Sequence, residues 1–151
     1  MQINHYLNFQ GQTEAAFQFY HAIFSGELLD LTRYADLPPQ PGIELSESEK
    51  QQILHITLRI NPHYQLMGSD YNTNFCSAIN NSFIQGNNHY ISINLVQGQE
   101  DEAKRLYEAL SENGEIEMPL APTFWGALYA AFRDQFGTHW MINCQTEAKP
   151  N

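Results

Sequence analysis

The sequence predicts an α+β fold in which two βαβββ modules follow one another along the chain. The first observation behind this prediction is a strand-like alternation of side chains that is followed at once by helical spacing. The second is that the same order of patterns begins again in the second half. The third is a nearly constant offset, because Asn8 and Asn94 are 86 residues apart and Tyr20 and Tyr107 are 87 apart. Two unrelated strand–helix units of similar composition are the alternative explanation.

The first module is expected to begin with a strand over residues 3–9. One face of this strand would carry Ile3, His5, Leu7 and Phe9, and the other would carry Asn4, Tyr6 and Asn8. From Thr13 the apolar residues take helical spacing, with Ala16, Phe17, Tyr20 and Phe24 on one stripe. Ser25-Gly26 is the expected end of this helix, because glycine readily adopts the left-handed conformation that closes a helix.

The rest of the first module is expected to contain strands, a loop and a short helix. These are a strand at 27–34, a Pro-rich loop at 38–42, a helical turn with a capping box of Ser46 and Glu49, a strand at 53–60 and a return strand at 65–70. Residues 71–88 are rich in Asn, Ser and Gly, which is typical of a linker.

The second module repeats the order strand, helix, strands. The expected elements are a strand at 90–96, a helix at 99–113 with Gly114 as its C-terminal cap, and strands at 115–120, 127–133 and 139–144, the last two joined by a hairpin turn at 134–137. A chain of this length is expected to form a single domain over 1–151. Its parts would be module 1 at about 1–70, the linker at about 71–88 and module 2 at about 89–145.

Composition limits the expected partners. Seventeen acidic residues against seven basic ones give a formal net charge of −10, without a cluster of Lys and Arg, so neither nucleic acid nor an anionic membrane is expected as a partner. Cys76 and Cys144 lack the spacing of a zinc or redox site, which favours a reducing compartment. The chain starts on a strand-like pattern rather than a secretion leader, and it has no apolar run of about 18 residues. We therefore expect a soluble cytoplasmic protein.

Several short motifs occur in the order found in one known superfamily. They are Y-L-N-F-Q-G with A-A-F-Q-F-Y (6–11 and 15–20), L-H-I-T-L-R-I (54–60), L-M-G-S-D (66–70), G-E-I-E-M-P with T-F-W-G (114–119 and 123–126), and D-Q-F-G-T-H-W-M-I-N (134–143). In these motifs the chain resembles the vicinal oxygen chelate superfamily, which includes glyoxalase I, bleomycin-resistance proteins and extradiol dioxygenases. The resemblance is strongest to its PhnB-like branch.

This resemblance implies a homodimer in which the two modules form a curled mixed sheet. The ligand would lie on the concave face, and the helices would cover the convex face. Proteins of this branch are sometimes labelled demethylubiquinone methyltransferases. The sequence has no Gly-rich loop that opens a helix after a strand to bind a methyl-donor nucleotide, so we do not expect that activity.

The metal-using members of the superfamily bind the ion with a His or Gln on the first strand and a Glu on the last strand of each module. The offset of 86 or 87 residues pairs His5 with Ile91 or Ser92, so His5 has no histidine at the equivalent place in the second module. The resemblance places the last-strand Glu at Met141, four residues after the glycine of D-Q-F-G, and Met67 stands at the comparable place in the first module. Thioethers are soft ligands, unsuited to Mg²⁺, Mn²⁺ or Fe²⁺. We therefore expect neither the usual metal quartet nor a cofactor.

A divalent ion at an unusual site is the alternative. Its ligands would come from His5, His55, His89 or His139 together with Asp70.

The parity of the strands selects the residues that would face a ligand. The apolar face of each strand is expected to pack under a helix, which turns the polar residues between them toward the cleft. The candidate cleft residues are Tyr6, Asn8, His55, Arg59, Tyr90, Asn94, Trp125 and Tyr129.

These candidates also have structural explanations. Arg59 could anchor a carboxylate or phosphate, or pair with one of the chain's own acids. His55 could serve as a general base near neutral pH, or be a hydrogen-bonded structural residue. Trp125 and Tyr129 could cap a ligand or fill a dimer interface, and the neighbouring Gly126 suggests a bulge or a close approach of the backbone.

Taken with the resemblance, the sequence favours a PhnB-like protein that binds a small molecule in the cleft of a homodimer, without the usual metal quartet. The alternative is a metal-dependent glyoxalase- or dioxygenase-like lyase or oxidoreductase. Whether the protein is an enzyme stays open, and no residue is assigned a catalytic role.

Overall fold

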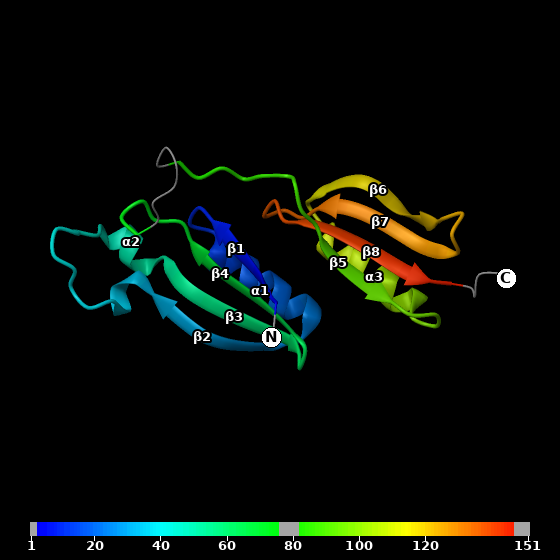
Figure 1. Cartoon of the computed structure of the whole chain (residues 1–151), viewed down its shortest axis with the longest axis horizontal. Coiled ribbons are helices and arrows are strands. Elements are labelled where there is room, and N and C mark those ends of the chain that lie inside the picture. Colours follow the sequence, from blue (N-terminus) through cyan, green and yellow to red (C-terminus); the bar gives the residue numbers. More distant parts are fainter. Residues whose placement is uncertain (1–2, 76–81, 147–151) are drawn as a thin grey trace. The chain divides into compact units, whose positions relative to one another are not determined.

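A computed structural model describes residues 3–75 and 82–146 (Figure 1). The chain divides into two compact units, Met1–Ile84 and Gln85–Asn151. Each unit has the order βαβββ, so the predicted α+β class and its two modules are confirmed. Part of the expected linker, residues 76–81 with Cys76, lies outside the described residues. That the two sheets are halves of one curled sheet stays a prediction.

The first unit is built on a four-stranded sheet with the order β1-β4-β3-β2. The strands are β1 (His5–Phe9), β2 (Glu27–Arg33), β3 (Ile53–Asn61) and β4 (Tyr64–Asp70). β1 runs parallel to β4, and the other neighbours are antiparallel. Helix α1 (Thr13–Phe24) packs on one face of this sheet (Figure 1). The core between helix and sheet consists of Leu7, Phe9, Ala16, Phe17, Tyr20, Ile56, Leu58 and Leu66.

A longer connection with two short helices joins β2 to β3. It contains the 3-10 helix η1 (Tyr34–Asp36) and helix α2 (Glu47–Gln51). The predicted capping box of α2 is present, since the Glu49 backbone N–H donates to Ser46 Oγ and Ser46 N–H donates to the Glu49 carboxylate.

The second unit repeats this architecture with the order β5-β8-β7-β6. Its strands are β5 (Ile91–Leu95), β6 (Glu115–Pro122), β7 (Ala127–Arg133) and β8 (His139–Gln145), and its helix is α3 (Glu100–Leu110). β5 runs parallel to β8 and pairs with it in the same way as β1 with β4. The core contains Ile91, Ala103, Leu106, Leu110, Phe132, Trp140 and Ile142. No helix among the described residues is both long and apolar enough to cross a membrane.

Helix α1 ends at the predicted Ser25-Gly26, whereas α3 ends differently from the prediction. Ser25 and Asn113 take a left-handed φ, of 52° and 56°, and Gly114, the expected C-terminal cap of α3, does not. α3 also stops at Leu110 instead of residue 113, and Ser111 Oγ donates to the Tyr107 carbonyl at 2.7 Å. Gly26 and Gly114 are needed for another reason, because a Cβ on either would lie under 3.0 Å from a backbone carbonyl oxygen, that of Arg59 or Arg133 respectively.

Gly126 is a turn residue rather than part of a bulge. It has a φ of 80°, and its N–H donates to the Thr123 carbonyl at 3.3 Å in the hairpin that joins β6 to β7. A side chain at this φ would strain the backbone, which explains the glycine.

Candidate functional site

The first sheet has one face under α1 and one face without a helix. On β1, Leu7 and Phe9 are buried, whereas Tyr6 and Asn8 are exposed on the opposite face. The Tyr6 hydroxyl lies 3.2 Å from His55 Nδ1, and the two rings stack with centroids 5.7 Å apart. The predicted parity is therefore correct for Tyr6, Asn8 and His55, which share the helix-free face of the first sheet.

His55 and Asn8 already have partners on this face. His55 Nε2 lies 3.1 Å from Thr57 Oγ1, and Asn8 Oδ1 accepts a hydrogen bond of 3.0 Å from Ser69. His55 is thus held by neighbours on both ring nitrogens, Tyr6 at one and Thr57 at the other. This arrangement orients the imidazole for stacking against a planar group.

Arg59 forms an ion pair with Glu27, the residue directly opposite on β2. The second sheet has the same pair, because Arg133 lies opposite Glu115 and binds it at 2.5 Å. Both pairs are largely exposed. Arg59 was expected either to anchor a ligand or to pair with an acid of the chain. The structure shows the ion pair, and its counterpart in the second sheet indicates that the pair belongs to the repeated architecture.

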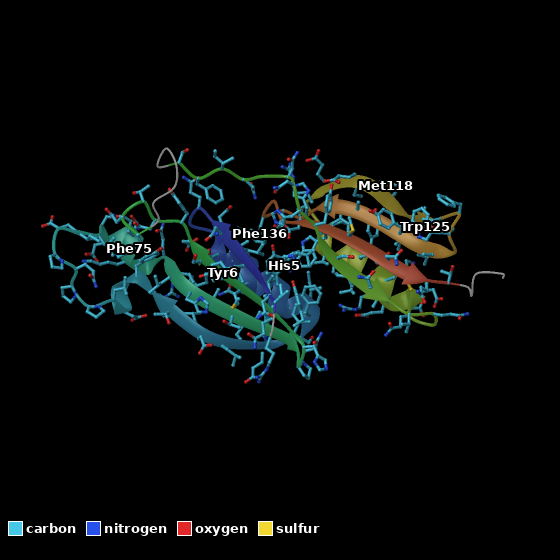
Figure 2. All side chains as sticks on the ribbon, in the orientation of Figure 1. His5, Tyr6, Phe75, Met118, Trp125 and Phe136 are labelled. Carbon is cyan, nitrogen blue, oxygen red and sulfur yellow. The ribbon has the colours of Figure 1, made fainter. Side chains whose placement is uncertain are left out.

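The second sheet also has a helix-free face, and four of the predicted residues lie on or beside it. Asn94 Nδ2 donates to Ser92 Oγ at 3.1 Å. Across the sheet, Asn143 lies between Asn94 and Tyr129 in the register of β5, β8 and β7. Trp125 comes from the hairpin after β6, as Figure 2 shows, and its Nε1 donates to Asn143 Oδ1 at 3.4 Å. The Trp125 and Tyr129 rings meet edge to face at 5.9 Å.

These contacts bring together two aromatic rings and two amide side chains. Trp125 is 38% exposed, and the adjacent Phe124 is 97% exposed. Trp125 turns back onto the sheet, and the exposed Phe124 ring meets the Trp125 ring edge to face with centroids 4.9 Å apart. A planar ligand with polar edges suits such a surface, since rings offer stacking area and amides offer both donors and acceptors.

The register identifies the residues that stand together on the first and last strands of each module. Tyr6 lies beside Met67 on β1 and β4, and Ser92 lies beside Met141 on β5 and β8. The next pairs along the helix-free faces are Asn8 with Ser69 and Asn94 with Asn143. None of these pairs combines an imidazole with a carboxylate.

The residues of the alternative metal site are largely engaged in other interactions. Asp70 is buried and accepts hydrogen bonds from Thr13 N–H at 3.0 Å, Thr13 Oγ1 at 2.7 Å and Ile53 N–H at 2.8 Å. It therefore caps the N-terminus of α1 from a neighbouring strand. His5 Nδ1 lies 3.0 Å from the Tyr64 hydroxyl. Within residues 3–75 and 82–146, no group of three or more His, Cys, Asp or Glu could hold a metal ion.

A third feature, not predicted from the sequence, is a hydrogen-bonded group around Glu117. The Tyr90 hydroxyl donates to Glu117 Oε2 at 2.5 Å, and His139 Nδ1 lies 3.0 Å from Glu117 Oε1. The hydrogen bond to the carboxylate raises the pKa of Tyr90. The register of β6 shifts between Ile116 and Met118, so Glu117 lies in an irregularity that directs its side chain toward the other strands.

A signal for this group was present in the sequence. The motif G-E-I-E-M-P places Glu115 and Glu117 two residues apart in a predicted strand, which points both carboxylates to one face. What the sequence could not reveal is that this face meets Tyr90 and His139 from two other strands.

Each unit also contains a pocket. The one in the second unit has a volume of about 420 Å³ and is lined by Glu115, Glu117, Arg133 and His139, with Gln85, Gly86 and Asn87. The one in the first unit, about 450 Å³, lies in the β2–β3 connection and is lined mainly by apolar residues, including Tyr34, Leu37 and Phe75. None of the predicted cleft residues lines the pocket of the first unit.

Comparison with known proteins gives the following similarities. The family model described as Glyoxalase/Bleomycin resistance protein/Dioxygenase superfamily matches residues 2–142. The protein YjdN of Escherichia coli (strain K12) is 30% identical over 151 residues, covering 95% of each chain.

Two solved structures are similar over nearly their whole length. The protein PA1353 of Pseudomonas aeruginosa is 33% identical, with a TM-score of 0.75 over 97% of this chain and 99% of that chain. A protein of Bacillus cereus described as a putative 3-demethylubiquinone-9 3-methyltransferase, PhnB protein, is 23% identical, with a TM-score of 0.68 over 95% of this chain and 99% of that chain.

Proposed function

Because this chain belongs to the glyoxalase/bleomycin resistance protein/dioxygenase superfamily, we propose that it is a PhnB-like protein that binds a small molecule without the metal quartet of the metal-using members. The ligand is received on the helix-free face of a sheet, in a homodimer. The compartment we propose is the cytoplasm.

The observation that carries this proposal is the pairing of Tyr6 with Met67 and of Ser92 with Met141. These are the equivalent places on the first and last strands of the two modules. A phenol, a hydroxyl and two thioethers make poor ligands for Mg²⁺ or Mn²⁺, which prefer carboxylate, and for Fe²⁺, which prefers imidazole and carboxylate. Such residues suit the binding of an organic molecule through apolar contact and hydrogen bonds.

The composition of the helix-free faces supports a planar ligand with polar edges. The first sheet offers the stacked pair Tyr6–His55, and the second offers Trp125, Tyr129 and the amide of Asn143. The B. cereus protein's description mentions a methyltransferase. We do not transfer that activity, because this sequence has no Gly-rich loop for a methyl-donor nucleotide.

A thermal-shift screen tests the proposal. The protein is dialysed against EDTA and challenged with aromatic metabolites and glycopeptide antibiotics, and a ligand that binds the folded chain raises the melting temperature. We expect at least one such compound to stabilise the protein, and Trp125→Ala to remove that stabilisation. The control is Ile84→Ala, which should leave it unchanged, because Ile84 is 78% exposed and lies outside both sheets. A screen in which no compound stabilises the EDTA-treated protein would contradict the proposal.

A metal-dependent lyase or oxidoreductase is the second candidate. Membership of a superfamily whose description includes dioxygenases is the observation that favours it. Stoichiometric Ni, Zn, Mn or Fe in protein purified without an affinity tag would support this candidate against the first.

A further inference from the structure

The helix-free face of the second sheet carries an acid–base group that the first sheet lacks. We propose that Glu117 holds His139 as a proton acceptor for a ligand that carries a weakly acidic hydroxyl, such as a phenol or an enol. This inference rests on the proposed function, since it names the chemical class of the ligand bound on that face.

The geometry fixes which ring nitrogen of a neutral His139 carries the proton. An ionised carboxylate has only acceptors, so Glu117 receives one hydrogen bond from the Tyr90 hydroxyl at 2.5 Å and one from His139 Nδ1 at 3.0 Å. Neutral His139 therefore carries its proton on Nδ1, which leaves the lone pair on Nε2. No described residue hydrogen-bonds to Nε2. A histidine held in this way by a carboxylate is oriented to accept a proton at its other nitrogen.

The surroundings of His139 suit this role. His139 is only 8% exposed, and it packs edge to face against Tyr90 with ring centroids 5.2 Å apart, so the imidazole is held in place. His139 and Glu117 both line the pocket of about 420 Å³, together with the ion pair Arg133–Glu115. A bound ligand would therefore meet an imidazole, a carboxylate and a guanidinium in one pocket.

Comparison of the two modules indicates that the fold does not require this group. The ion pair Arg133–Glu115 is repeated in the first sheet as Arg59–Glu27. Tyr90 and His139, by contrast, have no such counterparts. Asn4 takes the place of Tyr90 in the first module, at the same offset of 86 residues as Tyr6 from Ser92. Gln65 takes the place of His139, at the same offset of 74 residues as Met67 from Met141. In the first sheet Asn4 Oδ1 simply accepts a hydrogen bond of 3.3 Å from the Gln65 backbone. The acid–base group is an addition to the second module.

The proton transfer is balanced within the pocket. The ligand O–H bond breaks, and its proton moves to Nε2 of His139. The resulting imidazolium remains paired with the Glu117 carboxylate, and the electron pair stays on the ligand oxygen. The Arg133 guanidinium lines the same pocket and would stabilise the negative charge on the ligand oxygen. Glu115 would repel that charge only weakly, because it is paired with Arg133. Tyr90 keeps its own proton, because it donates to Glu117.

The first measurement needs no ligand. Two-dimensional ¹H–¹⁵N spectra of the histidine side chains, assigned with His139→Gln, report which ring nitrogen bears the proton. We expect the Nδ1–H tautomer for His139 in the wild type and a mixture of tautomers in Glu117→Ala. His63, exposed in the β3–β4 turn, is the internal control and should not change in Glu117→Ala. The Nε2–H tautomer for wild-type His139 would overturn the inference.

The second measurement uses 4-nitrophenol, a phenol that ionises near neutral pH and whose phenolate is coloured. At a pH below the probe's own pKa, where most of the free probe is protonated, we expect the wild type to increase the phenolate fraction of the bound probe several-fold over that in buffer. His139→Gln should abolish the increase, and the control His63→Gln should retain it. Equilibrium dialysis measures binding separately from ionisation.

The two measurements separate the failure of this inference from that of the proposed function. A probe that binds equally to wild type and His139→Gln without any change in ionisation would overturn the proton acceptor and leave small-molecule binding intact. A probe that does not bind would overturn the class of ligand assigned to this pocket. Failure of the proposed function would instead appear as a thermal-shift screen with no stabilising compound.

Discussion

Met67 and Met141 occupy the same position in the two sheets of this protein. Met67 lies beside Tyr6 across β4 and β1, and Met141 lies beside Ser92 across β8 and β5. The repeat therefore preserves a thioether at each of the two places where we expect, from the resemblance, the metal-using members of the superfamily to carry a carboxylate. This equivalence is the reason for proposing a ligand site without a metal.

Asp70 is expected to be essential for the stability of the first unit. It is buried and receives three hydrogen bonds from Thr13 and Ile53. In Asp70→Asn one carboxylate oxygen becomes an NH₂ group, which cannot accept a hydrogen bond from the backbone donor that it faces. We therefore expect a loss of about 3 kcal/mol in the free energy of unfolding. Urea unfolding measures the loss. Asp30→Asn is the matched control, since Asp30 is exposed at a left-handed φ of 53° that Asn also tolerates. Equal stabilities of the two variants would contradict this role of Asp70.

Gly26 and Gly114 are expected to be equally intolerant of a side chain. A Cβ at either position would lie under 3.0 Å from the carbonyl oxygen of Arg59 or Arg133, and a backbone atom cannot move aside as a flexible side chain does. We expect Gly26→Ala and Gly114→Ala each to cost about 1–3 kcal/mol of stability. Gly86→Ala is the control, because its nearest neighbour would be 3.7 Å away. Thermal unfolding of the three variants gives the comparison, and a stable Gly114→Ala would disprove the close approach.

The pair Arg33–Glu14 should make stability depend on pH. Two hydrogen bonds, of 2.8 and 3.0 Å, join the guanidinium to the carboxylate and lower the pKa of Glu14. A carboxylate whose pKa is lowered in the folded state stabilises the protein at pH values above its ordinary pKa. This stabilisation is lost as the pH falls through the lowered pKa.

Glu14→Gln should therefore lose up to about 1 kcal/mol at neutral pH, since Glu14 is 41% exposed and the pair is screened by solvent. The difference from the wild type should vanish in acid. The exposed Glu112 provides the control variant, Glu112→Gln, with no expected loss at either pH. A difference that grows as the pH falls would contradict the sign of this effect.

The ion pair Arg59–Glu27 is expected to contribute little to stability. Its side chains are 44% and 58% exposed, and exposed pairs are weakened by water and salt. A double-mutant cycle with Arg59→Gln and Glu27→Gln should give a coupling energy below about 1 kcal/mol that falls further in high salt. The equivalent cycle on Arg133 and Glu115 should give a similar value. A markedly larger coupling in the first sheet would indicate an additional role for Arg59.

The sequence predicts the fold of this protein closely, because its signals are local. Alternation on β1 separates Leu7 and Phe9 from Tyr6 and Asn8, and the structure confirms the division. The end of α3 was misjudged, since the helix stops at Leu110 instead of residue 113, and Asn113 rather than Gly114 takes a left-handed φ. Gly114 has a tertiary role instead, because the carbonyl oxygen of Arg133 on a neighbouring strand leaves no room for a side chain there.

The candidate site is less accessible to sequence reasoning. The sequence predicts which side of a strand Tyr90 and Arg59 occupy, but not the acid that each meets on another strand. Glu117 reaches Tyr90 and His139 from an irregular part of β6, and an irregularity of this kind has no period to detect. Asp70 is a case in which a possible functional residue has a structural role. Its carboxylate, considered as a metal ligand in the alternative site, caps helix α1.

Metal content and metal response, measured on one preparation, test whether the protein binds its ligand without a metal. The protein is purified without an affinity tag, analysed for Ni, Zn, Mn and Fe, dialysed against EDTA, and melted with and without each ion. The account predicts substoichiometric metal, an unchanged melting temperature after EDTA, and compounds from the thermal-shift screen that stabilise the protein equally in EDTA. Stoichiometric metal whose removal lowers the melting temperature and abolishes ligand binding would contradict it.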